Sequence, residues 1–247
     1  SNFGCFFYFA KLLIVLPDMN VPEQIITFEG VSIKIKREDL LHPFVSGNKF
    51  RKLKYNLLEA KNQKKTVLLT FGGAFSNHIL ATAAAGFENG FETIGVIRGD
   101  ELVEKINQNP TLKKASEFGM TFEFVTREEY RKKTSEEFIQ KLTQKFGDFY
   151  LLPEGGTNDL AIKGCEEILN SDDLTYINVC CAVGTGGTIS GVINSTSNVQ
   201  KVWGFPALKG SFLKEDIRKF ANKDNWELVD GYDFGGYGKI SDELIFF

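Results

Sequence analysis

The chain has few residues of the kinds that bind metal ions. Its 247 residues include two histidines and four cysteines, and no two cysteines have the C-x-x-C spacing of zinc sites. These residues are His42, His78, Cys5, Cys165, Cys180 and Cys181. Their scarcity argues against a metal site. Cys180 and Cys181 fall inside a predicted buried strand, where we expect no disulfide. Free cysteines favour a reducing, cytoplasmic location.

An excess of one charge and a membrane-spanning run are also missing. The formal net charge is −3, and the basic residues lie beside acidic ones, which argues against nucleic acid as a partner. The apolar stretch at residues 3–16 is interrupted by Lys11 and is shorter than the about 20 residues of a membrane helix. It also lacks the basic segment and cleavage site of a signal peptide. We therefore expect no membrane partner, and we interpret this stretch as a buried element or a contact between subunits.

Two common nucleotide-binding motifs are absent. No segment matches G-x-x-x-x-G-K-[ST], and Ile189 replaces the third glycine that a G-x-G-x-x-G motif would need after Gly184 and Gly186. The segment Gly184-Thr185-Gly186-Gly187-Thr188 nevertheless joins an apolar strand to a predicted helix. Such a loop lets backbone amides converge on a phosphate, assisted by the helix dipole. An ordinary strand–turn–helix connection has the same local pattern.

Strand and helix patterns alternate along the chain, without repeats or low-complexity linkers. The predicted strands are residues 67–69, 93–97, 121–125, 149–152, 176–182, 202–205 and 226–229. The predicted helices are residues 79–88, 110–118, 128–146, 160–169, 189–194 and 212–220. Asn109 before Pro110, and Thr126 with Glu129, are signals for the N-terminal caps of helices. In the long predicted helix 128–146, one face carries Tyr130, Thr134, Phe138 and Leu142. The alternation predicts an α/β fold with parallel sheets.

Lys49 stands at the start of a predicted amphipathic helix, in the run Ser46-Gly47-Asn48-Lys49-Phe50-Arg51-Lys52-Leu53. A lysine fixed there can be held partly out of water. Its pKa then falls, and its amine becomes a nucleophile able to form a Schiff base. Lys52, one turn later, can present a cation to an anionic group of a cofactor. Taken alone, the run is also consistent with two solvated lysines.

The polar trio Ser76-Asn77-His78 follows a strand and Gly72-Gly73, and it precedes an alanine-rich predicted helix. Free backbone N–H groups and the helix dipole favour an anion at such a helix start. The place suits a substrate carboxylate. A simple N-cap needs only one of these three side chains.

In this order, the three segments resemble the pyridoxal-phosphate enzymes of the tryptophan synthase β fold type. Within that group they are most similar to the 1-aminocyclopropane-1-carboxylate deaminase / D-cysteine desulfhydrase family. The matching segments are residues 36–39, 47–53, 72–73, 76–78, 152–156, 184–188 and 235–238. The resemblance implies pyridoxal 5′-phosphate as cofactor and two three-layer αβα domains with mainly parallel sheets. The larger, cofactor-binding domain would comprise residues 1–52 and 153–247, and the smaller inserted domain residues 53–152.

The resemblance also implies roles for single residues. Lys49 is similar to the Schiff-base lysine, which later moves protons, and Lys52 with the amides of residues 184–188 is similar to the phosphate site. Asn77 resembles the residue that bonds the pyridine ring oxygen. Together with Ser76 and His78 it would receive the substrate carboxylate.

The expected catalytic residues are Lys49, Ser76 and Tyr237. Tyr237, between Gly236 and Gly238, resembles an active-site tyrosine near the reacting carbons, where its phenol would act as an acid, a base or an orienting donor. An aromatic residue without a catalytic role in a glycine-rich loop fits the local sequence equally well.

Two departures from the family pattern shape the expected function. The family continues beyond the position of Phe247 with a segment that supplies a second tyrosine and a partner for the pyridine nitrogen, so we expect the C-terminal part of the larger domain to be missing. His78 stands where the cyclopropane-opening deaminases carry Gln. This favours elimination from D-cysteine, which yields pyruvate, sulfide and ammonia, over conversion of 1-aminocyclopropane-1-carboxylate to 2-oxobutyrate and ammonia.

Two other functions remain open at this stage. A truncated relative would bind the cofactor or a partner without efficient turnover. A nucleotide-binding oxidoreductase is disfavoured, because no acidic residue follows the glycine loop at the distance that a ribose requires. We expect a small amino acid as substrate and a homodimeric assembly.

Overall fold

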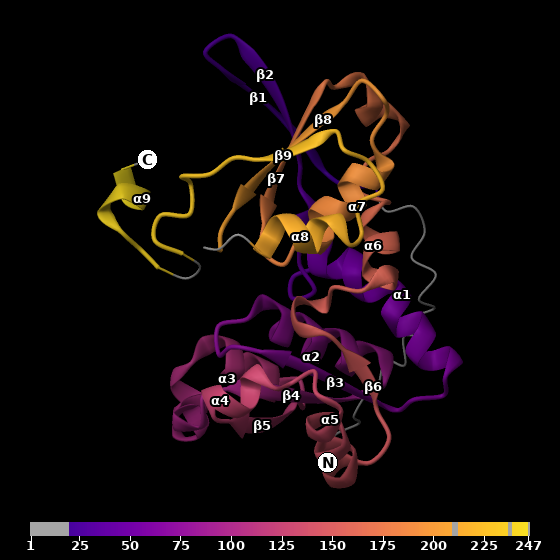
Figure 1. Ribbon diagram of the computed structural model, residues 1–247, viewed down its shortest axis with the longest axis vertical. Helices are drawn as coiled ribbons and strands as arrows, with labels where there is room; N and C mark the ends of the chain where they lie inside the picture. The colour runs from indigo at the N-terminus through magenta and orange to yellow at the C-terminus, as the bar shows by residue number, and fades with distance from the viewer. Residues whose placement is uncertain (1–19, 209–211, 237–238, 247) are drawn as a thin grey trace, which may run out of the picture.

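The computed structural model describes residues 20–208, 212–236 and 239–246, which form two parallel sheets and an antiparallel hairpin (Figure 1). The first sheet has the order β5-β4-β3-β6, with β3 (Val67–Gly72), β4 (Glu92–Arg98), β5 (Thr121–Val125) and β6 (Tyr150–Leu152). The second sheet has the order β7-β8-β9, with β7 (Asn178–Val183), β8 (Lys201–Pro206) and β9 (Trp226–Leu228). All neighbouring strands in both sheets are parallel, which confirms the predicted α/β fold.

Helices cover both faces of the first sheet. They are α2 (Asn77–Asn89) and α3 (Pro110–Glu117) on one face, and α4 (Arg127–Arg131) and α5 (Glu136–Phe146) on the other. Successive strand side chains point to opposite faces. Leu68 therefore packs with α1 (Asn48–Asn62) and α2, whereas Leu69 packs with α4 and α5.

The second sheet packs against α7 (Gly187–Ser195) and α8 (Phe212–Arg218) through Val183, Val202 and other apolar side chains. The prediction that β7 is buried was wrong for Cys180, which is exposed, while Cys181 is half-buried. The two residues point to opposite faces of the strand, and only the Cys181 side contributes to the core beneath α7 and α8. Both cysteines are free, as is Cys165.

Two further elements complete the description of the chain. The hairpin of β1 (Glu23–Phe28) and β2 (Val31–Lys36) projects from the body and is anchored where Lys34 and Lys36 pair with the buried Asp173 (Figure 1). Helix α6 (Asp159–Cys165) packs closely on α1. The remaining elements are η1 (Glu38–Leu40), η2 (Asp100–Gln108), η3 (Glu154–Gly156), η4 (Ser171–Thr175) and α9 (Asp242–Phe246).

The long helix predicted over residues 128–146 is two helices. The chain leaves the helical path after α4, and the Ser135 side chain accepts a hydrogen bond from Phe138 N at 3.3 Å, which starts α5. Thr134 lies in the break and is exposed. The predicted helix 160–169 likewise ends at Cys165. Both capping signals are confirmed, with Asn109 capping α3 and Thr126 forming a capping box with Glu129.

Several expectations are not tested by these elements. The apolar residues 3–16 and Tyr237 lie outside the described residues, and the division at residues 52/53 and 152/153 into two domains stays a prediction. Within the described ranges, no helix combines the length and the apolar character that a bilayer crossing requires. The same ranges contain no group of three or more His, Cys, Asp or Glu side chains arranged to hold a metal ion.

Candidate active site

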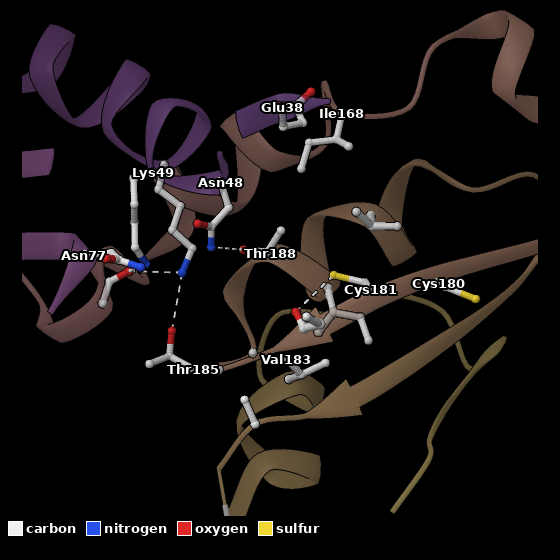
Figure 2. Close-up of a pocket in the computed structure, with 18 of the residues that line it drawn as sticks. Glu38, Asn48, Lys49, Asn77, Ile168, Cys180, Cys181, Val183, Thr185 and Thr188 are labelled. Atoms are coloured by element: carbon white, nitrogen blue, oxygen red, sulfur yellow. Dashed lines mark hydrogen bonds between the residues drawn. The ribbon is translucent and has the colours of Figure 1, made fainter. Parts of the chain in front are cut away.

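A cleft lies at the carboxyl ends of the parallel strands, which is where ligands bind in open α/β sheets. It is lined by the start of α1, by residues 73–78 after β3, by the segment after β6 and by residues 183–186 and Thr188 after β7. Figure 2 shows Lys49, Asn77, Thr185 and Thr188 around one part of this cleft. The three segments singled out in the sequence therefore meet at one place.

Lys49 and Lys52 reach the same backbone carbonyl from neighbouring turns of α1. Lys49 Nζ donates to Gly155 O at 3.2 Å, and Lys52 Nζ donates to it at 3.1 Å. Lys52 is 1% exposed and also donates to Thr157 Oγ1 at 2.9 Å and to Thr185 Oγ1 at 3.4 Å. All these partners are neutral oxygens, and no described carboxylate pairs with either ammonium group. A buried lysine and a half-buried one without a counter-charge fit an anion such as phosphate.

Burial changes the acid–base properties of both lysines. It lowers the pKa of Lys49 to about 7, and the positive charge of Lys52 adds to the effect. Burial likewise lowers the pKa of Lys52 to about 8. Desolvation disfavours the charged form of an amine, so both shifts have the expected sign. Near neutral pH a substantial fraction of Lys49 is unprotonated and can act as a nucleophile.

The start of α7 offers free backbone donors beside Lys52. Gly186 is the N-cap residue, with φ of 81°, and no side chain caps this helix. The first N–H groups of the helix are therefore available to an anion. A Cβ atom on Gly187 would lie 2.8 Å from Thr157 Oγ1 and 3.0 Å from Lys52 Nζ. Only a glycine leaves this space open.

Asn48 connects the start of α1 with the start of α7. Its Nδ2 donates to Thr188 Oγ1 at 2.7 Å, so the first turn of α1 is tied to the first turn of α7 (Figure 2). No local pattern in the run 46–53 indicates this role for Asn48.

The turn after β6 depends on two glycines in left-handed conformations. Gly155 has φ of 67° and Gly156 has φ of 70°, a region that other residues rarely adopt. A Cβ on Gly155 would also lie 2.8 Å from Thr185, and one on Gly156 would lie 2.8 Å from His78 Cε1. This turn aims the Gly155 carbonyl at both lysines.

The three polar residues at the start of α2 lie in three different environments. Ser76 is the N-cap residue, and its Oγ accepts from Ile79 N at 3.4 Å. Asn77 is exposed to the cleft. His78 is 1% exposed, and its Nε2 lies 2.8 Å from Thr70 Oγ1. The structure thus brings Ser76 and Asn77 to the cleft surface and places the His78 ring beneath it.

The bonding of Thr70 determines which nitrogen of His78 carries the proton. Thr70 Oγ1 donates its one proton to Leu152 O at 3.0 Å, so it accepts from His78 Nε2–H. Among the described residues, no hydrogen bond of normal geometry satisfies His78 Nδ1, while a backbone interaction with Pro153 acts to raise the pKa of the ring. Burial, with the charges of Lys49 and Lys52, holds the pKa of His78 well below its usual value. A neutral acceptor of this kind does not attract a carboxylate, so the proposed carboxylate site depends on Ser76, Asn77 and the amides of α2.

Sequence reasoning did not identify the residues that complete the cation site. Gly155, Thr157 and Asn48 act through a carbonyl, a hydroxyl and a carboxamide that any loop or helix start could carry. Residues 152–156 are among the segments that resemble the family, and the pair Gly155-Gly156, shortly after β6, is the local signal of a turn there. The assigned roles of Lys49, Lys52, Asn77 and residues 184–188 stay predictions.

Known proteins are similar to this chain in sequence and fold. Residues 22–209 match the family model described as pyridoxal-phosphate dependent enzyme. A putative 1-aminocyclopropane-1-carboxylate deaminase of Pyrococcus furiosus is 30% identical over 87% of this chain and 71% of its own length. A bifunctional D-cysteine desulfhydrase/1-aminocyclopropane-1-carboxylate deaminase of Arabidopsis thaliana is 32% identical over 66% of this chain and 44% of its own. The solved structure of a homologue of 1-aminocyclopropane-1-carboxylate (ACC) deaminase superposes with a TM-score of 0.73 at 27% identity, over 90% of this chain and 74% of that one.

Proposed function

This chain belongs to the pyridoxal-phosphate dependent enzyme family, and on that premise we propose that it is a lyase that converts D-cysteine and water to pyruvate, hydrogen sulfide and ammonia. The observation that supports this proposal most is the convergence of Lys49 and Lys52 on Gly155 O beside the uncapped start of α7. One amine of low pKa and one buried cation next to free amides are the groups that a phosphorylated aldehyde requires.

Each residue then has a distinct task. Lys49 Nζ would hold the cofactor, and it would accept the proton that leaves the α-carbon of the substrate and pass it on when the bond between the β-carbon and sulfur breaks. Lys52 and the amides of α7 hold the phosphate, and Asn77 orients the ring. Ser76 and the amides at the start of α2 bind the substrate carboxylate. When bound, the cofactor supplies the electron sink that allows a bond to the α-carbon to break. The homodimer and the cytoplasmic location expected from the sequence stay predictions.

The choice of D-cysteine rests on His78. His78 stands where the cyclopropane-opening deaminases resemble one another in carrying Gln, and the desulfhydrase-like members resemble this chain in the trio Ser-Asn-His. Its buried ring lies beneath the cleft surface, in contact with Thr70 and against Gly156. A glutamine carboxamide at this position would present a different pattern of donors and acceptors. Relatives with both activities are known by name, so 1-aminocyclopropane-1-carboxylate is the alternative substrate.

The first test is the site and pH dependence of cofactor attachment. The protein is mixed briefly with pyridoxal phosphate at pH 5.5–9, reduced with borohydride at one common pH, and mapped by peptide mass spectrometry. We expect the adduct on Lys49. Its rate of formation should rise with pH through a midpoint near 7, because the pKa of Lys49 is lowered to about 7 and only the neutral amine reacts.

Two variants sharpen this experiment. Lys49→Arg should lose the adduct, and Lys61→Arg, at the exposed end of the same helix, should retain it. An adduct on another lysine, or a rate that has not levelled off by pH 9, would contradict the assignment of Lys49.

The second test compares the two substrates on one preparation. Sulfide release from D-cysteine should exceed 2-oxobutyrate release from 1-aminocyclopropane-1-carboxylate. His78→Gln should shift the ratio of the two rates toward 2-oxobutyrate about tenfold, or about 1.4 kcal/mol, because it installs the residue that the cyclopropane-opening enzymes carry. A clear preference of the wild type for the cyclopropane would overturn the choice of substrate. Adduct formation without either product would favour a binding protein over an enzyme.

A further inference from the structure

Asn56 lies one turn beyond Lys52 on α1 and is completely buried. Its Nδ2 donates to Lys52 O at 2.8 Å and to Asn158 Oδ1 at 3.1 Å. Its Oδ1 accepts from Tyr150 OH at 3.0 Å and from Asn158 Nδ2 at 2.7 Å. Both donors and both lone pairs of the carboxamide are therefore used. Exchanging its oxygen and nitrogen would set an oxygen against the Lys52 carbonyl, so its orientation is determined.

The partners of Asn56 come from three elements that meet at the cation site. Tyr150 belongs to β6, and Lys52 belongs to α1. Asn158 is the N-cap of α6, where its Oδ1 also accepts from Ala161 N at 2.9 Å. Asn158 directly follows Thr157, whose hydroxyl bonds Lys52 Nζ. Asn56 thus bonds the chain on either side of the turn that carries Gly155 and Thr157.

We propose that Asn56 is a positioning residue for the anion site, and that it holds the turn 155–157 at the distance from α1 that Lys52 requires. The inference rests on the proposed function, in which Lys52 holds the phosphate of the cofactor. Lys52 Nζ bonds Gly155 O and Thr157 Oγ1, both on this turn. If the turn moves away from α1, the ammonium group loses these partners and no longer faces the start of α7.

Volume alone does not explain this residue. A leucine has nearly the same size and would remove the polar group from a buried position. Asn56→Leu would remove one hydrogen-bond partner each from Tyr150 OH, Asn158 Nδ2 and Asn158 Oδ1. Polar groups that lose partners in the interior raise the free energy of the folded state. Those groups would be expected to move until they find new partners, and Asn158 carries Thr157 with it.

Gln200 provides a matched control for an ordinary buried carboxamide. It is 2% exposed, and its Nε2 donates to Asp173 O at 2.9 Å and to Tyr176 O at 2.8 Å. These bonds hold the segment before β7, and neither of them involves Lys49, Lys52 or the turn 155–157. Gln200→Leu therefore loses comparable buried bonds without touching the turn 155–157.

The experiment measures dissociation constants of pyridoxal phosphate and of inorganic phosphate, together with melting temperatures, for the wild type and three variants. We expect Asn56→Leu to weaken both ligands about tenfold or more. Tyr150→Phe, which removes one bond and serves if Asn56→Leu fails to fold, should weaken them about threefold. Gln200→Leu should lower the melting temperature similarly and change both constants less than twofold.

The outcomes separate this inference from the proposed function. A wild type that binds neither ligand overturns the function and the inference together. A wild type that binds both, with Asn56→Leu and Tyr150→Phe equal to it, overturns the inference alone. Equal weakening by Gln200→Leu would show that Asn56 acts only through general stability and would also overturn it.

Discussion

Lys52→Met is expected to weaken the binding of pyridoxal phosphate by about ten- to a hundredfold, since hydrogen bonds to charged groups contribute about 1.5–3 kcal/mol. The same change should leave the unliganded protein at least as stable as the wild type. Burial lowers the pKa of Lys52 to about 8, which means that the folded protein disfavours its charge. Methionine fills a similar volume without that charge.

The acceptors around Lys52 keep partners after the substitution. Gly155 O still accepts from Lys49 Nζ at 3.2 Å. The hydroxyls of Thr157 and Thr185 lie 2.8 Å apart and bond each other. No buried oxygen is therefore left alone, and the usual penalty of breaking one half of a buried pair does not arise.

Titration of the ligand and thermal unfolding at several pH values check this prediction. The unfolded chain binds the Lys52 proton more tightly than the folded one, so the wild type gains stability relative to Lys52→Met as the pH rises from about 8 toward 10.5. Lys61→Met, at the exposed end of the same helix, is the control and should change neither quantity. Unchanged cofactor affinity in Lys52→Met would remove this residue from the proposed phosphate site.

Gly187→Ala is expected to reduce cofactor affinity roughly tenfold or more, which corresponds to about 1.4 kcal/mol. The added Cβ would lie 2.8 Å from Thr157 and 3.0 Å from Lys52 Nζ. Real contacts are not that short, so these two side-chain ends must shift. The lysine end is flexible but the β-branched Thr157 is stiff, and we expect a cost in stability within the about 1–3 kcal/mol typical of overpacking. The larger effect is displacement of the cation from the start of α7.

Gly184→Ala is the matched control in the same loop. A Cβ there meets nothing within 4 Å, and Gly184 is not among the glycines with positive φ. Each of the two variants keeps the backbone amide of the substituted residue and adds one methyl group. The variants differ in what that methyl group meets. Equal loss of cofactor in the two variants, measured by equilibrium dialysis, would show that the methyl group at position 187 has no special effect.

The sequence indicated the elements that approach the cleft because their signals are local. A lysine beside a helix start and a glycine loop between a strand and a helix can each be recognised within about eight residues. Parallel order then brings loop ends together at one edge. That rule covers residues 76–78 and 184–188, which follow β3 and β7, whereas the resemblance to a known family placed Lys49 with them.

What the sequence did not reveal depends on contacts between distant segments. Nothing near His78 indicates that Thr70 and Gly156 enclose its ring. The pairing of Asn56 with Asn158 joins residues 102 positions apart. The helix break before Ser135 was missed for a different reason. The stripe from Tyr130 to Phe138 fits one continuous helix, and a serine that starts a second helix is also acceptable within a helix.

The two amines of the cation site stand three positions apart on one helix, and this spacing places them on the same side of α1. Gain or loss of a single codon between them would turn one about 100° around the axis relative to the other. The segment from Lys49 to Lys52 is therefore a stretch in which length itself is constrained, independently of side-chain chemistry. A change of length at the start of α1 would therefore separate the nucleophile from its anion-binding partner even if every side chain were kept.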